Sequence, residues 1–237
     1  MQLLTPNEWM TKAASEIPDD QSAVLFMRHC ERYTDPPDGD YSKLLLTPNG
    51  IKMANDIGTS INRKIRLLRS SPIERCKQTI REVIKFIPPE FAPTKDTEIK
   101  TSKDFFELLG NPSPKESGGV GWFEYFHYLQ EHDVESAQGI SLEAETKHIL
   151  DAIFAETLDS REAASYTDDS STTAPLDLIC SHDCHVIVLA SALFDHKTDM
   201  SLTSKWCQFA EGLLFYGTRR NFTAFWRGQK KTFVDYL

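Results

Sequence analysis

The chain has 237 residues, of which 40% are hydrophobic, and its 26 Lys and Arg residues against 35 Asp and Glu residues give a formal net charge of -9. This size supports one sizeable core, so we expect a single domain over residues 1–237. A surface of that charge repels polyanions, which argues against nucleic acid as a partner. An anionic substrate must instead be attracted by a local cluster of cations.

The N-terminal residues and the cysteines bear on the cellular compartment. Residues 1–20 include four acidic side chains and lack the basic start and apolar run of a signal peptide. No segment of the sequence is apolar for long enough to span a membrane. Five cysteines without regular spacing fit a reducing compartment. We therefore expect a cytoplasmic protein with no membrane partner, and the sequence does not indicate its oligomeric state.

The first predicted elements are a strand and a helix. Residues 23–27 form an apolar run without alternation, which is typical of a strand buried on both faces, and Arg28 and His29 follow it directly. Thr47 and Pro48 then provide the N-cap and the first residue of a helix with apolar residues at helical spacing.

A second strand and helix follow in the same order. Residues 65–68 are the second apolar run. Ser71, Pro72 and Glu74 have the spacing of a capping box, so we expect Ser71 to cap a helix that extends to about Phe86.

The remaining elements lie in the second half of the chain. Residues 141–154 have the pattern of an amphipathic helix, and residues 176–180 form the third apolar run. Ser181, His182 and Asp183 follow that run, and residues 185–193 are predicted to form a buried helix. Turn residues at 217–221 predict a hairpin at the edge of the sheet.

Strands that alternate with helices predict a three-layer α/β/α fold with a mostly parallel sheet and helices on both faces. Ligands of such sheets bind beyond the carboxyl ends of the strands, where all three polar strand endings would meet. Residues 87–135 include a segment rich in Pro, Gly and charge and then an aromatic stretch, which predicts a small cap or lid insertion over that edge.

The polar residues at the three strand endings have the chemistry of phosphoryl transfer. That reaction needs a nucleophile, positive charge around the phosphoryl oxygens and an acid for the leaving oxygen. The residues are, in chain order, Arg28, His29 and Arg32, then Arg75, then His182 and Asp183. Arg suits phosphate because its planar fork donates paired hydrogen bonds and remains charged.

Four segments together resemble the histidine phosphatase superfamily, which includes phosphoglycerate mutases and histidine acid phosphatases. Residues 28–32, Arg-His-Cys-Glu-Arg, are similar to its first motif, Arg-His-Gly followed by a further Arg. Residues 70–79 match its Ser-Ser-Pro, Arg and Gln-Thr pattern, and residues 46–50 look like its first helix start. Residues 181–183 are similar to the His-Asp pair of the acid phosphatase branch.

The resemblance implies that His29 takes up the phosphoryl group as a phosphohistidine, without a metal or cofactor. The residues implied to hold the phosphoryl oxygens are Arg28, Arg32, Arg75 and His182. Asp183 is implied as the acid that protonates the leaving oxygen and then, as a base, helps water to attack. The other branch of the family takes its acid from a Glu, and Glu107 is the alternative here. The arginines are expected to lower the pKa of His29.

One departure from the family pattern is Cys30, which stands where the family has Gly. A side chain at this position is expected to reshape the phosphate pocket or to make it sensitive to oxidation. The residues Cys180, His182, Cys184 and His185 could also suggest zinc, but such a crowded run does not easily surround an ion tetrahedrally.

The sequence favours hydrolysis of a small phosphorylated substrate, because the His-Asp pair is that of the acid phosphatase branch. A phosphoglycerate mutase-like phosphotransferase and a non-catalytic phosphate-binding protein are the alternatives. The substrate itself would depend on residues 33–41 and 104–128, whose arrangement the sequence does not determine.

Overall fold

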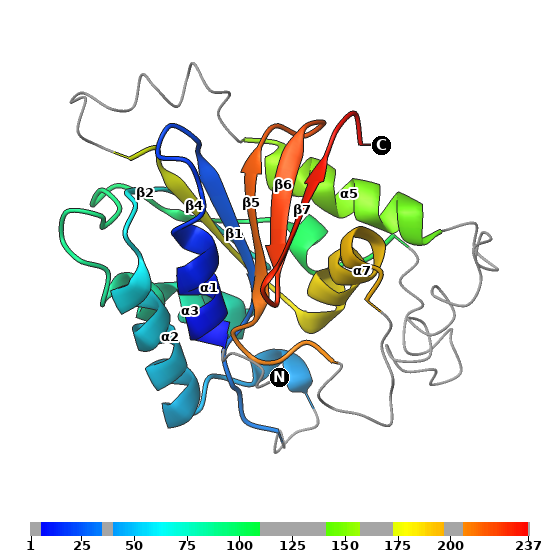
Figure 1. The fold of residues 1–237 in the computed structure, drawn as a ribbon. Coiled ribbons are helices and arrows are strands. Elements are labelled where there is room, and N and C mark those ends of the chain that lie inside the picture. Colours follow the sequence, from blue (N-terminus) through cyan, green and yellow to red (C-terminus); the bar gives the residue numbers. More distant parts are fainter. Residues whose placement is uncertain (1–5, 35–39, 110–140, 157–172, 197–205, 237) are drawn as a thin grey trace.

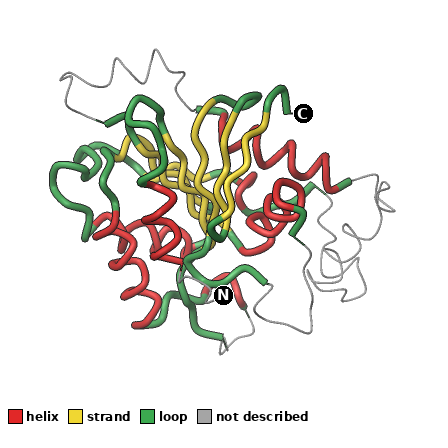
Figure 2. Tube along the Cα trace, viewed as in Figure 1, coloured by secondary structure: helices red, strands yellow, loops and turns green. Residues whose placement is uncertain are grey.

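The computed structural model describes residues 6–34, 40–109, 141–156, 173–196 and 206–236 (Figures 1 and 2). Its α-helices are α1 (Pro6–Ala14), α2 (Pro48–Ser60), α3 (Glu74–Ile84), α5 (Leu142–Phe154) and α7 (Asp183–Phe194). Its strands are β1 (Ala23–Arg28), β2 (Ile65–Ser70), β3 (Ile99–Thr101), β4 (Leu176–Ser181), β5 (Gly212–Gly217), β6 (Phe222–Trp226) and β7 (Gln229–Phe233). Two short 3-10 helices are η1 (Tyr41–Lys43) and η2 (Lys103–Phe105). None of the helices in these ranges is long and apolar enough to cross a membrane.

The strands form one mixed sheet in the order β3-β2-β4-β1-β5-β6-β7. The pairs β3-β2, β2-β4 and β4-β1 are parallel, and the pairs β1-β5, β5-β6 and β6-β7 are antiparallel. The change occurs because the strands up to β4 are connected by crossovers, whereas β5, β6 and β7 follow one another through tight turns. The predicted hairpin is confirmed, with the Thr218 N–H donating to the Asn221 carbonyl oxygen at 2.8 Å.

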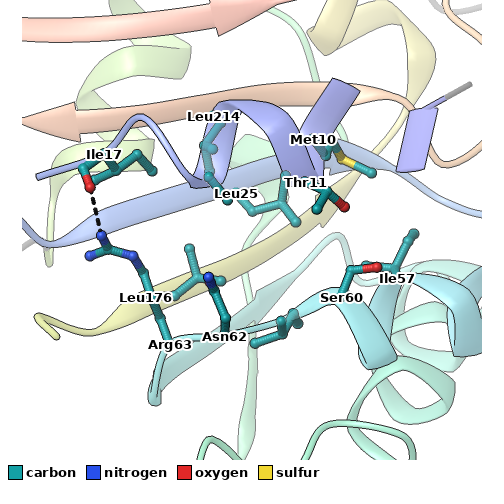
Figure 3. Close-up of a pocket in the computed structure, with 12 residues that line it drawn as sticks. Met10, Thr11, Ile17, Leu25, Ile57, Ser60, Asn62, Arg63, Leu176 and Leu214 are labelled. Atoms are coloured by element: carbon teal, nitrogen blue, oxygen red, sulfur yellow. Dashed lines mark hydrogen bonds between the residues drawn. The ribbon is translucent and has the colours of Figure 1, made fainter. Parts of the chain in front are cut away.

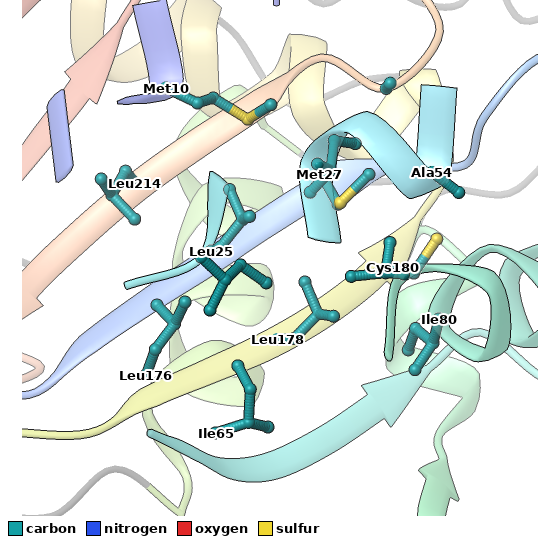
Figure 4. Close-up of a cluster of buried hydrophobic side chains, with 14 of the residues drawn as sticks. Met10, Leu25, Met27, Ala54, Ile65, Ile80, Leu176, Leu178, Cys180 and Leu214 are labelled. Carbon is teal, nitrogen blue, oxygen red and sulfur yellow. The ribbon is translucent and has the colours of Figure 1, made fainter. Parts of the chain in front are cut away.

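Helices cover both faces of the sheet, which confirms the predicted three-layer α/β/α fold. Figure 1 shows α1, α2 and α3 on one face and α5 and α7 on the other. Because side chains alternate along a strand, β1 contributes to both cores. Val24 and Phe26 pack with α5 and α7, whereas Leu25 and Met27 pack with α1, α2 and α3. Figure 4 shows the second of these cores, which lies beneath three helices.

The start of α2 is held tightly against the loop that follows β1. The Thr47 side chain accepts a hydrogen bond from the Gly50 N–H at 2.9 Å, as predicted for its N-cap. A Cβ atom on Gly50 would lie only 2.0 Å from the Glu31 carbonyl oxygen, so this position requires glycine. The Glu31 carboxylate in turn accepts hydrogen bonds from Thr47 and Asn49.

The predicted cap of the next helix is wrong. α3 begins at Glu74 with Ile73 as its N-cap and without a side-chain capping bond, and it ends at Ile84 rather than Phe86. Ser71 does not cap the helix, because its hydroxyl group lies 2.9 Å from the Nε2 atom of His182. A serine with a helix-capping pattern is thus used by the site at the edge of the sheet.

The predicted insertion falls mainly on residues outside the described ranges. Of the predicted insertion, residues 110–135 lie outside the described ranges. Of the described portion, β3 pairs with β2 in the main sheet, and Phe105 and Leu108 are buried in the core beneath α5 and α7. The cap or lid itself stays a prediction.

A small cavity lies between α1, α2 and the sheet, toward the amino ends of the parallel strands (Figure 3). Its volume is about 40 Å³, and apolar side chains such as Met10, Leu25 and Leu214 line it. Its one guanidinium, that of Arg63, is 4% exposed and donates to four main-chain carbonyl groups, including those of Ile17 and Ala174. The cavity is therefore a packing feature, remote from the polar strand endings.

Candidate active site

The polar residues that follow β1, β2 and β4 meet at the carboxyl edge of the parallel strands, as predicted. The His29 N–H donates to the Ser181 carbonyl oxygen at 3.0 Å, and the Ser71 N–H donates to the Cys180 carbonyl oxygen at 2.9 Å. These main-chain bonds hold the first residues beyond β1 and β2 against the end of β4. The side chains that come together there are Arg28, His29, Arg75, His182 and Asp183.

His29 is buried, with 2% of its surface exposed, and is held in one tautomer. Its Nδ1 atom lies 2.8 Å from the Cys30 carbonyl oxygen, which can only accept, so we place the ring proton on Nδ1. Its Nε2 atom accepts a hydrogen bond from Nε of Arg75 at 3.0 Å and therefore carries a lone pair. Burial, followed by the nearby His182, Arg75 and Arg28, holds the pKa of His29 well below its ordinary value, despite the opposing bond to Cys30. His29 has the properties of a neutral nucleophile.

Arg75 connects the two histidines. While its Nε donates to His29, its Nη2 lies 3.4 Å from Nδ1 of His182 and its Nη1 donates to the Tyr41 carbonyl oxygen at 2.9 Å. The two imidazole rings lie edge to face with their centroids 5.5 Å apart. The guanidinium thus occupies the position facing the His29 lone pair, where an incoming phosphoryl group would take its hydrogen bonds.

Asp183 and Arg28 form an ion pair beside the histidines. The Oδ2 atom of Asp183 lies 3.0 Å from Nη2 of Arg28 and accepts from the Trp206 indole N–H at 2.9 Å. Asp183 lies in the first turn of α7, where helix N-termini favour negative charge, and its Oδ1 accepts from the Cys184 N–H at 3.0 Å. Burial raises the pKa of Asp183, but Arg28, Trp206 and His182 outweigh burial, so the pKa lies below its ordinary value. Asp183 is a carboxylate at neutral pH.

Arg32 and Glu107 lie farther from the two histidines. Arg32 donates to the Tyr33 carbonyl oxygen at 2.7 Å, and its guanidinium lies 5.8 Å from the centre of the Tyr41 ring. Burial and the like charge of Arg28 lower the pKa of Arg32, which indicates that the two arginines share one region. Glu107 is exposed, and its carboxylate lies 3.5 Å from the Lys103 ammonium group. Asp183 is therefore the better-placed carboxylate.

Sequence reasoning missed the contribution of residues 206–211, which precede β5. Phe209 stacks beneath the Arg28 guanidinium at 4.1 Å, and its ring centre lies 5.8 Å from that of His29. Nη1 of Arg28 donates to the Cys207 carbonyl oxygen at 2.5 Å. The segment contacts the site through a main-chain carbonyl, an indole N–H and a ring face. Such groups do not form a recognisable pattern of catalytic residue types, so the sequence did not indicate a role for this segment. Ser71 was missed for a different reason, since its pattern matches a helix cap.

The expectation for Cys30 is corrected by the structure. Its side chain is fully buried in the core that contains α1, α2 and α3, so it points away from the side chains of Arg28, His29 and Arg75. Its N–H donates to the Thr79 hydroxyl at 3.1 Å. Burial raises the pKa of the Cys30 thiol to about 12, and a protonated buried thiol resists oxidation.

The alternative zinc site gains no support from the arrangement of its residues. Cys180 and Cys184 are buried, and Cys184 Sγ contacts Nδ1 of its own neighbour His185 at 3.2 Å. His182 instead faces Ser71 and Arg75. Over the described ranges, no group of three or more His, Cys, Asp or Glu side chains is arranged to hold a metal ion.

Comparison with known proteins defines the fold. No protein-family model and no curated protein sequence matches the chain. Among solved structures, phosphoglycerate mutase from Bacillus anthracis str. Sterne is 16% identical with a TM-score of 0.50, over 90% of this chain and 93% of that one. A phosphoserine phosphatase from Entamoeba histolytica is 16% identical, over 89% and 94% of the two chains, with a TM-score of 0.47. Mycobacterial glucosyl-3-phosphoglycerate phosphatase is 13% identical, over 92% and 100%, also with a TM-score of 0.47.

The chain therefore has the phosphoglycerate mutase-like α/β/α fold. This is the fold that the motif resemblance implied. At such identities a shared fold does not define an activity, which has to be argued from the site.

Proposed function

We propose that the protein is a metal-independent phosphomonoester hydrolase that acts through a phosphohistidine on His29. The observation that carries the proposal is the state of His29: its Nε2 atom carries a lone pair that accepts a hydrogen bond from Arg75, and burial and the neighbouring charged groups keep it unprotonated. Arg28 and Arg75 concentrate positive charge and hydrogen-bond donors there, in a chain whose net charge is -9. This combination suits a small phosphorylated substrate.

In the first step, the phosphoryl group binds among Arg28, Arg75 and His182, with Arg32 as a further cation of the same region. The hydrogen bond from Arg75 to His29 is exchanged for one to a phosphoryl oxygen, which frees Nε2. Nε2 attacks phosphorus as the bond to the leaving oxygen breaks, and that oxygen takes a proton from Asp183. The alcohol or phenol leaves, and the phosphoryl group stays on His29.

In the second step, water attacks the phosphorus atom and the bond to Nε2 breaks. Asp183, now a carboxylate, accepts a proton from the attacking water, so inorganic phosphate is released and both residues return to their starting states. Arg28 and Arg75 neutralise the equatorial oxygens in both steps. The Nδ1–H bond to the Cys30 carbonyl keeps the imidazole oriented throughout.

Asp183 can act as the acid only in its protonated form. Because its folded-state pKa is lowered, the protonated fraction is small at neutral pH and increases about tenfold for each unit that the pH falls toward that pKa. The pKa of His29 is also lowered, so the nucleophile stays neutral over the same interval. The two shifts together favour hydrolysis at acidic pH.

The proposal is tested by release of product from an aryl phosphate at neutral and mildly acidic pH, with a chelator present. The wild type is compared with His29→Ala and with His148→Ala. His148 is the control because it is a histidine on α5 whose ring pairs with Asp104, at 3.7 Å, rather than with a residue of the candidate site. We expect turnover in the wild type and the control and none in His29→Ala. Turnover that survives in His29→Ala contradicts the proposal. Binding of inorganic phosphate without any turnover of aryl or alkyl phosphates indicates the non-catalytic alternative, and phosphoryl exchange between two small substrates indicates the mutase.

A further inference from the structure

Ser71 is a buried hydroxyl that contacts a proposed phosphate-binding histidine. It directly follows β2, which ends at Ser70, and it is 0% exposed. Its Oγ atom is 2.9 Å from Nε2 of His182 and accepts a longer bond, 3.3 Å, from the Ile73 N–H. The motif comparison gives Ser71 no role, and the helix-capping role suggested by its sequence is excluded by the structure.

The direction of the Ser71 bond follows from the other nitrogen of the His182 ring. Nη2 of Arg75 can only donate, and it lies 3.4 Å from Nδ1 of His182, so Nδ1 acts as an acceptor in the free protein. In a neutral imidazole the proton is then on Nε2, which donates it to Ser71. His182 thus presents a lone pair to Arg75 and a proton to the Ser71 hydroxyl.

A bound phosphoryl group requires the opposite placement of the proton on the His182 ring. Phosphoryl oxygens accept hydrogen bonds, so His182 must present a proton on Nδ1 to contribute to binding. If the ring stays neutral, Nε2 must then accept, and a hydroxyl group can turn from acceptor to donor without moving its oxygen atom. The other group described near Nε2 is the Cys76 thiol, at 3.7 Å, which is a weak partner.

We propose that Ser71 is a positioning residue that holds the His182 ring and lets it change tautomer when the phosphoryl group binds. This inference rests on the proposed function, because it assumes that His182 donates to the phosphoryl group. Ser71 itself acts through His182 and makes no contact with the reacting atoms. The proposal thus adds the Ser71 hydroxyl, directly after β2, to the arginines and histidines that the motifs assign to the site.

The first test compares Ser71→Ala with Ser71→Thr, which keeps a hydroxyl, and with Ser70→Ala. Ser70 is the matched control, because it is also 0% exposed and its hydroxyl donates to the Ser71 carbonyl oxygen at 2.7 Å rather than to His182. We expect kcat/KM for an aryl phosphate to fall about 10- to 100-fold in Ser71→Ala, the size of loss seen when a residue that orients a metal-ligating histidine is removed, and to stay within about threefold in Ser70→Ala. Substantial recovery in Ser71→Thr supports the hydroxyl as the group responsible. Equal values for Ser71→Ala and Ser70→Ala overturn the proposal.

The second test needs no turnover and separates this proposal from the proposed function. Nitrogen-15 NMR of the His182 ring reports which nitrogen carries the proton, with and without inorganic phosphate. In the wild type we expect the proton on Nε2 without phosphate and a protonated Nδ1 with phosphate. In Ser71→Ala we expect phosphate affinity to fall about tenfold or more and the Nδ1-protonated form to be reduced. An unchanged His182 response in Ser71→Ala overturns the role of Ser71, whereas absence of turnover in the wild type overturns only the proposed function.

Discussion

Asp183→Asn changes the proposed acid with little change in size. The carboxylate accepts hydrogen bonds from the Cys184 N–H and the Trp206 indole and pairs with Arg28. An amide offers one oxygen and an NH2 group, so at least one of these three donors loses its acceptor. The substitution therefore has two separable effects: it removes the transferable proton, and it loosens the position of Arg28.

The two effects differ in how they depend on the leaving group. A general acid contributes about 10²- to 10⁴-fold, but only where the leaving oxygen needs a proton, as in an alkyl phosphate. A nitrophenolate departs without one. A weakened charge-assisted bond to Arg28 costs about 1.5–3 kcal/mol, or about 10- to 150-fold, and lowers the rates of both substrates alike. Asp183→Asn should thus lower the ratio of alkyl to nitrophenyl hydrolysis by about 100-fold or more.

The assay measures kcat/KM for p-nitrophenyl phosphate and for a simple alkyl phosphate, in the wild type, Asp183→Asn and Glu107→Gln. Glu107 is the control because its exposed carboxylate pairs with Lys103, and both of its values should stay near those of the wild type. Equal losses on the two substrates in Asp183→Asn would refute the acid role and leave Asp183 as a holder of Arg28. A leaving-group-dependent loss in Glu107→Gln would instead assign the acid to Glu107.

Three further predictions concern the pH dependence of turnover, the Trp206 contact and the close approach at Gly50. The wild-type kcat/KM for the alkyl phosphate should increase as the pH falls from 7 to 5, because the lowered pKa of Asp183 restricts its protonated form to low pH while His29 stays neutral; a pH–rate profile for this substrate that rises toward alkaline pH contradicts this. Burial raises the pKa of Asp183, whereas Arg28 and then the indole N–H bond of Trp206 lower it, so Trp206→Phe should raise this pKa. The decline of kcat/KM toward higher pH should then occur at higher pH than in the wild type, and an unmoved decline argues against the contact. Gly50→Ala places a Cβ atom 2.0 Å from the Glu31 carbonyl oxygen and should cost about 1–3 kcal/mol or more of unfolding free energy in urea; a cost below about 0.5 kcal/mol contradicts the close approach.

The fold and the main cluster could be predicted because their signals are local. The apolar runs at 23–27, 65–68 and 176–180 each form a parallel strand, and a parallel sheet brings the residues after each strand to one edge whatever the strand order. His29 and His182 could therefore be placed together without knowledge of the structure.

Other features of the site depend on side-chain directions that a sequence pattern does not contain. Ser71 has the spacing of a capping box, but its hydroxyl turns to His182. Cys30 stands at a motif position, but its thiol points into the core. Trp206 and Phe209 approach Arg28 and Asp183 only because β5 pairs antiparallel with β1, which is a long-range contact.

The most direct test of the account is a search for the phosphohistidine itself. The wild type is mixed rapidly with an aryl phosphate, quenched under alkaline denaturing conditions that preserve phosphorylated histidine, and analysed as peptides by mass spectrometry. We predict that one phosphoryl group is attached to His29 during turnover and that His29→Ala carries none. Turnover with no phosphoryl group on His29, or with the group on another residue, would contradict the mechanism.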